Sequence, residues 1–305
     1  MKLIIFLTTV LFLNSSQAMY GQVNTSDVPE NFCRLLIYKA DDTLRTICSG
    51  TLISSTEVAT AGHCVAPMQE AGNRMQVDCG YKSRNGYKMK IELTQKGTKV
   101  FTEGVYFKES QTASVFYINP TYWTEPTGDT GRVILPQPSA LTVSKVLSSE
   151  DLFRYGREAA LQYAPTFQNC RVGGYGVTQG EVAGYPLIGE YGEIYFMDGA
   201  LLKLIDIQAV PEEQKIPFSK AANSSNPVRA LSWFLADNGY IPASIDAGDS
   251  GSGMICEVDG EWQLVGVATD YKLETAPGAY FLNYKQMWMP FDREKTTQLV
   301  VPNSP

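Results

Sequence analysis

The sequence predicts an all-β protein. Short runs rich in Val, Ile, Tyr and Phe recur along the chain, separated by Gly, Pro, Asn and Asp, as in "CRLLIYKA", "RVILPQ" and "WQLVGVATD". Helical periodicity is scarce, and strands do not alternate with helices as in βαβ units. Many short strands in a chain of 305 residues favour a barrel or a sandwich. We expect a helical stretch within residues 219–239 and a short C-terminal helix from Asn283, which Pro290 kinks or ends.

The first 18 residues, MKLIIFLTTVLFLNSSQA, are typical of a signal peptide. One Lys precedes an apolar run, and small polar residues follow it up to Ala18, where we expect cleavage. The apolar run is too short for a stable membrane anchor. We therefore expect a signal peptide at residues 1–18 and a secreted or periplasmic domain at residues 19–305, with no membrane anchor after removal of the leader.

Composition excludes some functions and favours others. The formal net charge is −7 and no basic patch stands out, so nucleic acid is not an expected partner. An even number of cysteines, six, in an exported chain indicates three disulfides. There is no CxxC pair and only one His, so we expect neither a metal site nor a cofactor.

Two stretches carry residues suited to nucleophilic catalysis. "ATAGHCVA" contains the only His, His63, and "SIDAGDSGSGMIC" contains Ser250. A hydroxyl nucleophile needs a base within reach and an acid that orients the base. The second stretch is also an ordinary turn sequence, because Gly, Asp and Ser favour turns.

Both stretches resemble known blocks of the trypsin/chymotrypsin-like serine protease family. "CSGTLISSTEVATAGHC" is similar to its histidine block and "GDSGSGMIC" to its nucleophile block, in the family's order and with each Cys in place. The resemblance implies two perpendicular antiparallel β-barrels, in halves of roughly residues 19–140 and 141–305. It also implies a serine endopeptidase that cleaves a protein or peptide substrate through an acyl-enzyme.

The resemblance assigns roles to individual residues. His63 is the base, Ser250 is the nucleophile, and the N–H groups of Gly248 and Ser250 form the oxyanion hole. "GDTGRVILPQP" is similar to the family's acid block and favours Asp129 as the acid, with Asp151 and Asp78 as alternatives. The spacing from His63 to Asp129 is long for the family and indicates an insertion near residues 81–128. The implied disulfides are Cys48–Cys64 and Cys170–Cys256, which leave Cys33 and Cys79 to pair with each other.

The substrate pocket is where the family pattern changes. The resemblance assigns this pocket to Ser244, Thr269, Asp270, Tyr271 and Gly278. Ser244 at the base is not acidic, so the base predicts no demand for Arg or Lys, although Asp246 nearby could attract a cation. Tyr271 stands where the family has a Gly, which predicts a narrow pocket for small or modest apolar side chains.

Activation and activity are the remaining questions. No I-V-G-G-like run lies between Ala18 and Cys48. Asp249 needs a partner, which is either a processed N-terminus near Val23 or an internal cation such as an Arg. For a zymogen, an activating protease is a further expected partner. The alternative function is a catalytically inactive protease-like binding protein; a disulfide-stapled adhesion module ranks behind, because it leaves both blocks unexplained.

Overall fold

The computed structural model describes most of the chain. The described residues are 20–21, 23–24, 28–83, 86–94, 98–102, 105–110, 115–125, 128–178, 181–182, 187–215, 220–221, 223–241, 243–274, 276 and 283–301. The predicted signal peptide and Gly278 lie outside them.

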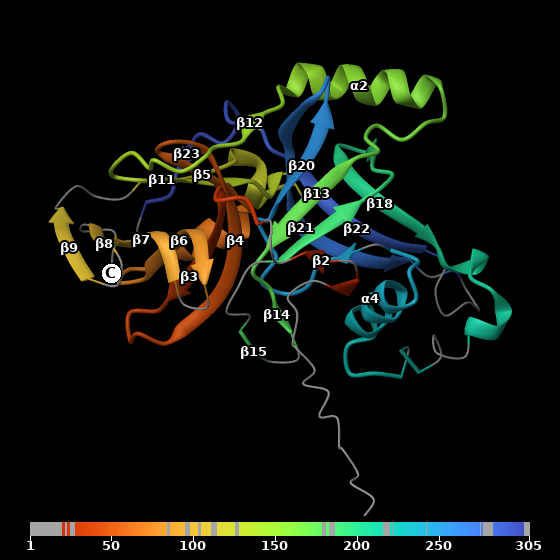
Figure 1. The fold of residues 1–305 in the computed structure, drawn as a ribbon, viewed down its shortest axis with the longest axis horizontal. Coiled ribbons are helices and arrows are strands. Elements are labelled where there is room, and N and C mark those ends of the chain that lie inside the picture. Colours follow the sequence, from red (N-terminus) through yellow and green to blue (C-terminus); the bar gives the residue numbers. More distant parts are fainter. Residues whose placement is uncertain are drawn as a thin grey trace, which may run out of the picture.

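The first large sheet is built mainly from the N-terminal half of the chain and is antiparallel throughout. Its strands, in spatial order, are β23 (Gln298–Leu299), β10 (Val115–Ile118), β11 (Gly131–Ile134), β5 (Glu57–Thr60), β4 (Leu44–Ser54), β3 (Phe32–Tyr38), β6 (Arg74–Ser83), β7 (Gly86–Thr94), β8 (Thr98–Thr102) and β9 (Val105–Ser110). Strands β7 to β9 lie within the insertion expected near residues 81–128 and extend one edge of the sheet (Figure 1).

The second large sheet is built mainly from the C-terminal half. Its strands, in spatial order, are β17 (Tyr195–Met197), β18 (Ala200–Asp206), β22 (Asn283–Pro290), β21 (Glu261–Glu274), β20 (Gly253–Val258), β13 (Cys170–Gly174), β16 (Leu187–Tyr191) and β2 (Val23–Asn24). β12 (Lys145–Val146) pairs in parallel with β21. Two small sheets pair β1 (Tyr20–Gly21) with β19 (Ala243–Ser244) and β14 (Val177–Thr178) with β15 (Glu181–Val182). Figure 1 shows the two large sheets side by side, and the predicted all-β fold with two antiparallel β units is confirmed. The boundary near residue 140 between the halves stays a prediction.

Helices are few and lie around the sheets. Those that lie wholly within the described residues are α1 (Gly62–Val65), α2 (Ser149–Leu161) and α4 (Pro227–Asp237), with 3₁₀ turns η1 (Ala66–Gln69), η2 (Pro120–Trp123), η4 (Ile207–Ala209) and η5 (Glu212–Gln214). α2 begins after Ser148, whose side chain accepts a hydrogen bond from the N–H of Asp151 and so caps the helix. α4 confirms the helical stretch expected within residues 219–239. In the described part of the chain, no helix is long and apolar enough to span a bilayer.

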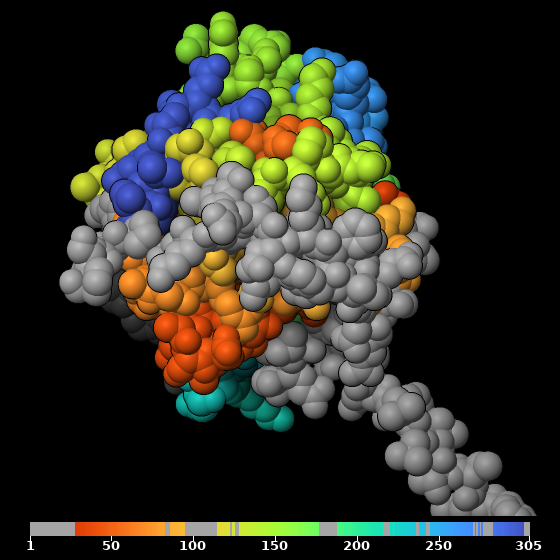
Figure 2. Space-filling view, turned by 90° about the vertical axis from the view of Figure 1, so that its left-hand side faces the viewer, coloured from red at the N-terminus to blue at the C-terminus, as the bar shows by residue number. Residues whose placement is uncertain are grey.

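The predicted C-terminal helix is wrong. Residues 283–290 form β22, in which burial alternates from Asn283 to Trp288, with Tyr284, Gln286 and Trp288 buried. This period of two matches a strand, and β22 pairs along its own length with residues 266–274 of β21. The following residues, 291–299, return to the first sheet, where β23 pairs with β10; we call them the C-terminal strap. Figure 2 shows the strap in dark blue on the surface of the molecule.

Three disulfides tie neighbouring elements together, as expected for an exported chain. Cys33–Cys79 joins the paired strands β3 and β6, and Cys170–Cys256 joins the paired strands β13 and β20. Cys48–Cys64 joins β4 to α1. The described part of the chain contains no free cysteine.

Candidate active site

Two paired strands bring His63 and Asp129 together. β11 pairs with β5 so that Gly131, the first residue of β11, lies opposite Thr60, the last residue of β5. After Thr60 the chain passes through Ala61 into the one-turn helix α1, which carries His63. Asp129 precedes Gly131 by two residues, so both side chains leave the same end of the strand pair.

Asp129 contacts His63 through both carboxylate oxygens. The backbone N–H of His63 donates to Oδ1 at 2.9 Å, and Nδ1 of the ring lies 2.8 Å from Oδ2. A carboxylate at Nδ1 favours a proton on that nitrogen and leaves Nε2 available as a base. The approach requires Gly62, because a Cβ there would lie 2.7 Å from the Tyr122 ring and 3.1 Å from Oδ1 of Asp129. Burial, and then the charge of Asp129, raises the pKa of Tyr122.

The two alternative acids lie elsewhere. Asp78 is fully buried in β6 and accepts hydrogen bonds from Nε and Nη2 of Arg34 at 3.2 and 2.7 Å. Asp151 lies in the first turn of α2 and pairs with Arg154 at 2.7 Å. Of the three candidate acids, Asp129 is therefore the one that contacts His63.

Ser250 lies in a tight turn, residues 246–252, which we call the Ser250 turn. The N–H of Asp249 donates to the carbonyl oxygen of Asp246 at 2.9 Å, and the N–H of Ser252 donates to that of Asp249 at 2.8 Å. These two bonds close the backbone on each side of Ser250. Its own side chain is half-buried.

The Ser250 turn packs against the strand that leads to His63. Gly251 has a φ of +83°, and a Cβ at this residue would lie 2.1 Å from Oγ1 of Thr60. Both the backbone conformation and the space therefore require glycine. The N–H of Gly251 also donates to the carbonyl oxygen of Ala268 in β21 at 2.7 Å. The turn is thus held between the two large sheets, beside the segment that carries His63.

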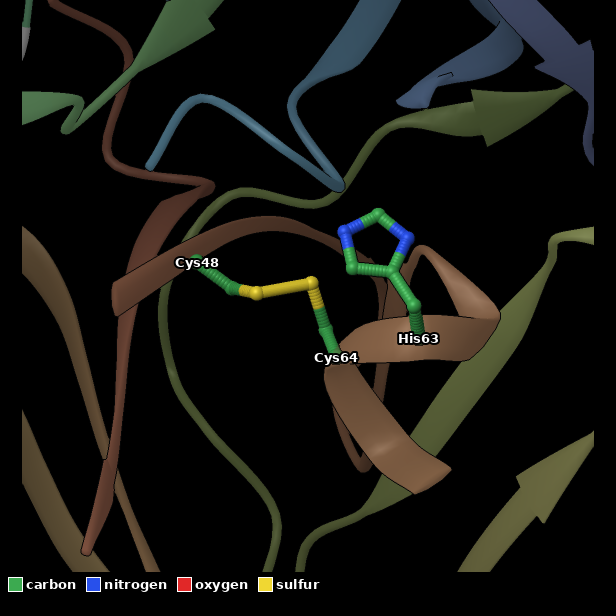
Figure 3. A group of neighbouring side chains, drawn as sticks. All are labelled: Cys48, His63 and Cys64. Carbon is green, nitrogen blue, oxygen red and sulfur yellow. A yellow bond between two sulfur atoms is a disulfide. The ribbon is translucent and has the colours of Figure 1, made fainter. Parts of the chain in front are cut away.

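The Cys48–Cys64 disulfide lies beside His63 and the Ser250 turn. Sγ of Cys64 is 3.6 Å from the carbonyl oxygen of Ser250. Figure 3 shows the His63 ring rising from α1 next to the disulfide. Ligand atoms of Cys48, His63 and Cys64 lie within 4.8 Å of one another, but the two sulfurs are bonded to each other. They therefore offer no thiolate to a metal ion.

Two backbone N–H groups of the Ser250 turn have no acceptor among the described residues. They belong to Gly248, which has a φ of +93°, and to Ser250, whereas the N–H groups of the three residues Asp249, Gly251 and Ser252 are all bonded. Free N–H groups beside a serine can receive a developing oxyanion. The Ser250 hydroxyl likewise has no hydrogen bond to the described residues. In unliganded active sites the contact between nucleophile and base is often long and closes when substrate binds.

Asp249 was expected to pair with a cation, but its described partners are backbone N–H groups. Its side chain is fully buried and accepts hydrogen bonds from the N–H groups of Gly176 and Asp246, both at 2.8 Å. Burial raises the pKa of Asp249 well above its ordinary value, in spite of these two bonds. Among the described residues no cation pairs with it. Val23 lies in β2, paired with Gly189 of β16.

A cation near the Ser250 turn, Arg229, pairs with Asp246 and not with Asp249. Nε of Arg229, from α4, lies 2.9 Å from Oδ1 of Asp246, and Nε1 of Trp233 donates to Oδ2 at 3.4 Å. Asp246 is 4% exposed, and burial raises the pKa of its carboxyl group. A carboxylate that is buried and already paired is not free to attract a basic substrate side chain.

The pocket residues are only partly described. Ser244 belongs to β19, where it pairs with Tyr20 of β1. Thr269 stands at an irregularity of β21, immediately after Ala268, which bonds the Ser250 turn. Asp270 follows in the same strand and is exposed; the backbone of Tyr271 pairs with Gln286, and Gly278 lies outside the described residues.

Of three comparisons of the chain with known proteins, one finds similar proteins, and these are solved structures. No family model and no curated protein matches it. Among solved structures, it is similar to an HL collagenase at 12% identity and a TM-score of 0.47, over 88% of this chain and 92% of the other. It is also similar to the protease Anisep from Arthrobacter nicotinovorans at 11% identity and a TM-score of 0.47, over 91% of this chain and 96% of the other.

Sequence reasoning missed two polar residues at the site. Ser49 directly follows Cys48 in the histidine block, and its hydroxyl bonds the Ser250 turn. Arg229 lies in α4, and the sequence contains no pattern that links it to Asp246. The one sequence signal for Ser49 was its place directly after Cys48 in the histidine block.

Proposed function

We propose that the protein is a serine endopeptidase, with Ser250 as nucleophile, His63 as general base and Asp129 as the acid that orients it. The observation that carries this proposal is the pair of contacts between Asp129 and His63, at 2.9 and 2.8 Å, beside a turn in which two N–H groups have no acceptor among the described residues. Together they supply an oriented base, a hydroxyl and donors for an oxyanion.

The proposed reaction proceeds in two halves. His63 takes the proton of the Ser250 hydroxyl through Nε2 while Oγ attacks the scissile carbonyl carbon. The N–H groups of Gly248 and Ser250 stabilise the tetrahedral oxyanion, and Asp129 stabilises the imidazolium. His63 then gives the proton to the leaving amine, and the acyl-enzyme remains on Ser250. Water, deprotonated by His63, attacks the ester, which releases the acid and restores the serine.

The proposed substrate is a protein or peptide whose selected side chain is uncharged. Ser244 at the proposed base carries no charge, and Asp246 is paired with Arg229 at 2.9 Å. Neither residue therefore offers a free carboxylate that could select Arg or Lys. A cleavage profile on a peptide library tests this: strong preference for Arg or Lys at the cleaved position would contradict it.

The proposed location is outside the cytoplasm, after removal of residues 1–18. Three disulfides are consistent with an oxidising compartment. Cleavage after Ala18 would leave Met19 one residue before β1, whereas cleavage at Val23 would remove β1 and its pairing with β19. We therefore favour processing near Ala18, and N-terminal sequencing of the exported protein tests it.

Labelling with a fluorophosphonate probe tests the catalytic proposal. The wild-type protein, both as exported and after mild proteolysis, should label, and Ser250→Ala should not. Ser252→Ala is the matched control, because this serine is two residues away and fully buried; it should label like wild type. Failure of the wild type to label in either form would favour the inactive binding protein. Labelling that persists in Ser250→Ala would assign the nucleophile to another serine.

A further inference from the structure

Ser49 connects the first sheet to the Ser250 turn through its side chain. The residue lies in β4, directly after Cys48, and is fully buried. Its hydroxyl donates to the carbonyl oxygen of Gly248 at 3.0 Å and accepts from the N–H of Tyr175 at 2.9 Å. A single hydroxyl therefore holds two chain segments that approach it from the second half of the protein.

The backbone of Ser49 makes two further bonds at the same place. Its N–H donates to the carbonyl oxygen of Ser250 at 2.8 Å, and its carbonyl oxygen accepts from Oγ1 of Thr60 at 2.7 Å. Ser49 thus holds the carbonyl groups of Gly248 and Ser250, the two residues whose N–H groups have no acceptor among the described residues. Donors to an oxyanion are effective only if they are already oriented before the reaction.

We propose that the Ser49 side chain is a positioning residue, which orients Gly248 so that its N–H can receive the oxyanion. This inference rests on the proposed peptidase function. Gly248 has a φ of +93° and no side chain, so its own conformational preferences restrict it little. In the described part of the chain, the Ser49 hydroxyl is the one group bonded to the Gly248 carbonyl. Ser49 itself touches no reacting atom.

Tyr175 holds the Ser49 hydroxyl from the side opposite Gly248. This residue is fully buried, its hydroxyl donates to the carbonyl oxygen of Phe32 at 3.3 Å, and its ring centroid lies 6.2 Å from that of Tyr87. The N–H of Tyr175 fixes one lone pair of Ser49 Oγ and so directs the hydroxyl proton toward Gly248. Without the hydroxyl, the buried N–H of Tyr175 and the partly buried carbonyl of Gly248 would both lose a partner.

Two neighbouring hydroxyls provide matched controls. Thr51, two residues along β4, and Ser252, in the Ser250 turn, are both fully buried, and neither side-chain oxygen has a hydrogen-bond partner in the described structure. Thr51→Val and Ser252→Ala therefore remove a buried hydroxyl from the same region without removing a bond to Gly248.

The experiment compares Ser49→Ala with these controls on a peptide substrate, at a temperature well below the lowest melting temperature of the set. We expect kcat to fall about 10- to 100-fold in Ser49→Ala, because the Gly248 carbonyl and the buried Tyr175 N–H lose their partner, with KM within about threefold of wild type. The affinity for a peptidyl trifluoromethyl ketone, whose oxygen occupies the oxyanion hole, should fall in parallel, and that for the product peptide should not. Ser49→Thr, which keeps a hydroxyl, should recover part of kcat.

Other results would overturn the inference. A kcat in Ser49→Ala within twofold of wild type, an equal loss in either control, or a loss confined to KM would each do so. If Ser49→Ala does not fold, Ser49→Gly takes its place; failure of both to fold would make Ser49 a structural residue and reject a positioning role. The proposed function fails separately, if the wild type does not react with the fluorophosphonate or Ser250→Ala still does.

Discussion

His63 and Asp129 are joined by two contacts, one from the backbone and one from the ring. The N–H of His63 donates to Oδ1 at 2.9 Å while Nδ1 lies 2.8 Å from Oδ2. The backbone contact fixes the carboxylate relative to α1, so the second oxygen meets the ring at a defined angle. The Asp129 carboxylate is therefore held by the main chain of the residue whose ring it contacts.

Asp129→Asn should reduce kcat about 10⁴-fold. The amide NH2 group in place of Oδ2 can donate to Nδ1, which favours the tautomer of His63 that carries its proton on Nε2. Steady-state kinetics with a peptide substrate measure this. Asp151→Asn, on the exposed start of α2, is the control and should retain wild-type kcat. A normal rate in Asp129→Asn would assign the orienting role to another group.

Gly251→Ala should lower kcat much more than the same substitution in a turn where the added Cβ meets nothing. The residue has a φ of +83°, and an added Cβ would lie 2.1 Å from Oγ1 of Thr60 and 2.3 Å from the carbonyl oxygen of Ser49. Gly260→Ala is the matched control, because its φ is +79° but nothing lies within 4 Å of the added Cβ. The control should lose only about 1–2 kcal/mol in the free energy of unfolding and keep its activity. Equal kcat values in the two variants would show that the close packing of Gly251 does not matter.

Asp249→Asn should flatten the dependence of stability on pH. Burial raises the pKa of Asp249 in the folded state above its ordinary value of 3.8. The folded state therefore holds the proton more tightly, and the stability that this group contributes is present below 3.8 and lost as the pH rises through the raised pKa. Urea unfolding from about pH 4 to about pH 7 should show a smaller loss in Asp249→Asn than in wild type.

The exposed Asp198 provides the control for this measurement, since Asp198→Asn keeps a residue tolerated at its φ of +51°. Its pH dependence should follow that of wild type. The opposite outcome, a steeper loss of stability with rising pH in Asp249→Asn than in wild type, would mean that a cation holds Asp249 ionised. A processed N-terminus is the first candidate for such a cation.

Local sequence was sufficient to predict features that depend on residues close together in the chain. The β-rich runs predicted the fold class because alternation and turn residues are local signals. The two blocks around His63 and Ser250 identified the candidate reactive side chains for the same reason. The C-terminal helix was predicted wrongly, because "NYKQMWMP" pairs with β21 along its whole length, and such long-range pairing overrides local preference.

The sequence by itself determined the all-β class, the number of disulfides and the two stretches that carry the candidate chemistry. Only the tertiary structure separated Asp129 from Asp78 and Asp151, because the contact with His63 depends on the pairing of β5 with β11. Only the tertiary structure showed that Arg229 pairs with Asp246 and that Ser49 reaches Gly248, 199 positions away along the chain. Spacing in a sequence carries information about turns and strands, whereas contacts between distant segments depend on how the two sheets pack against each other.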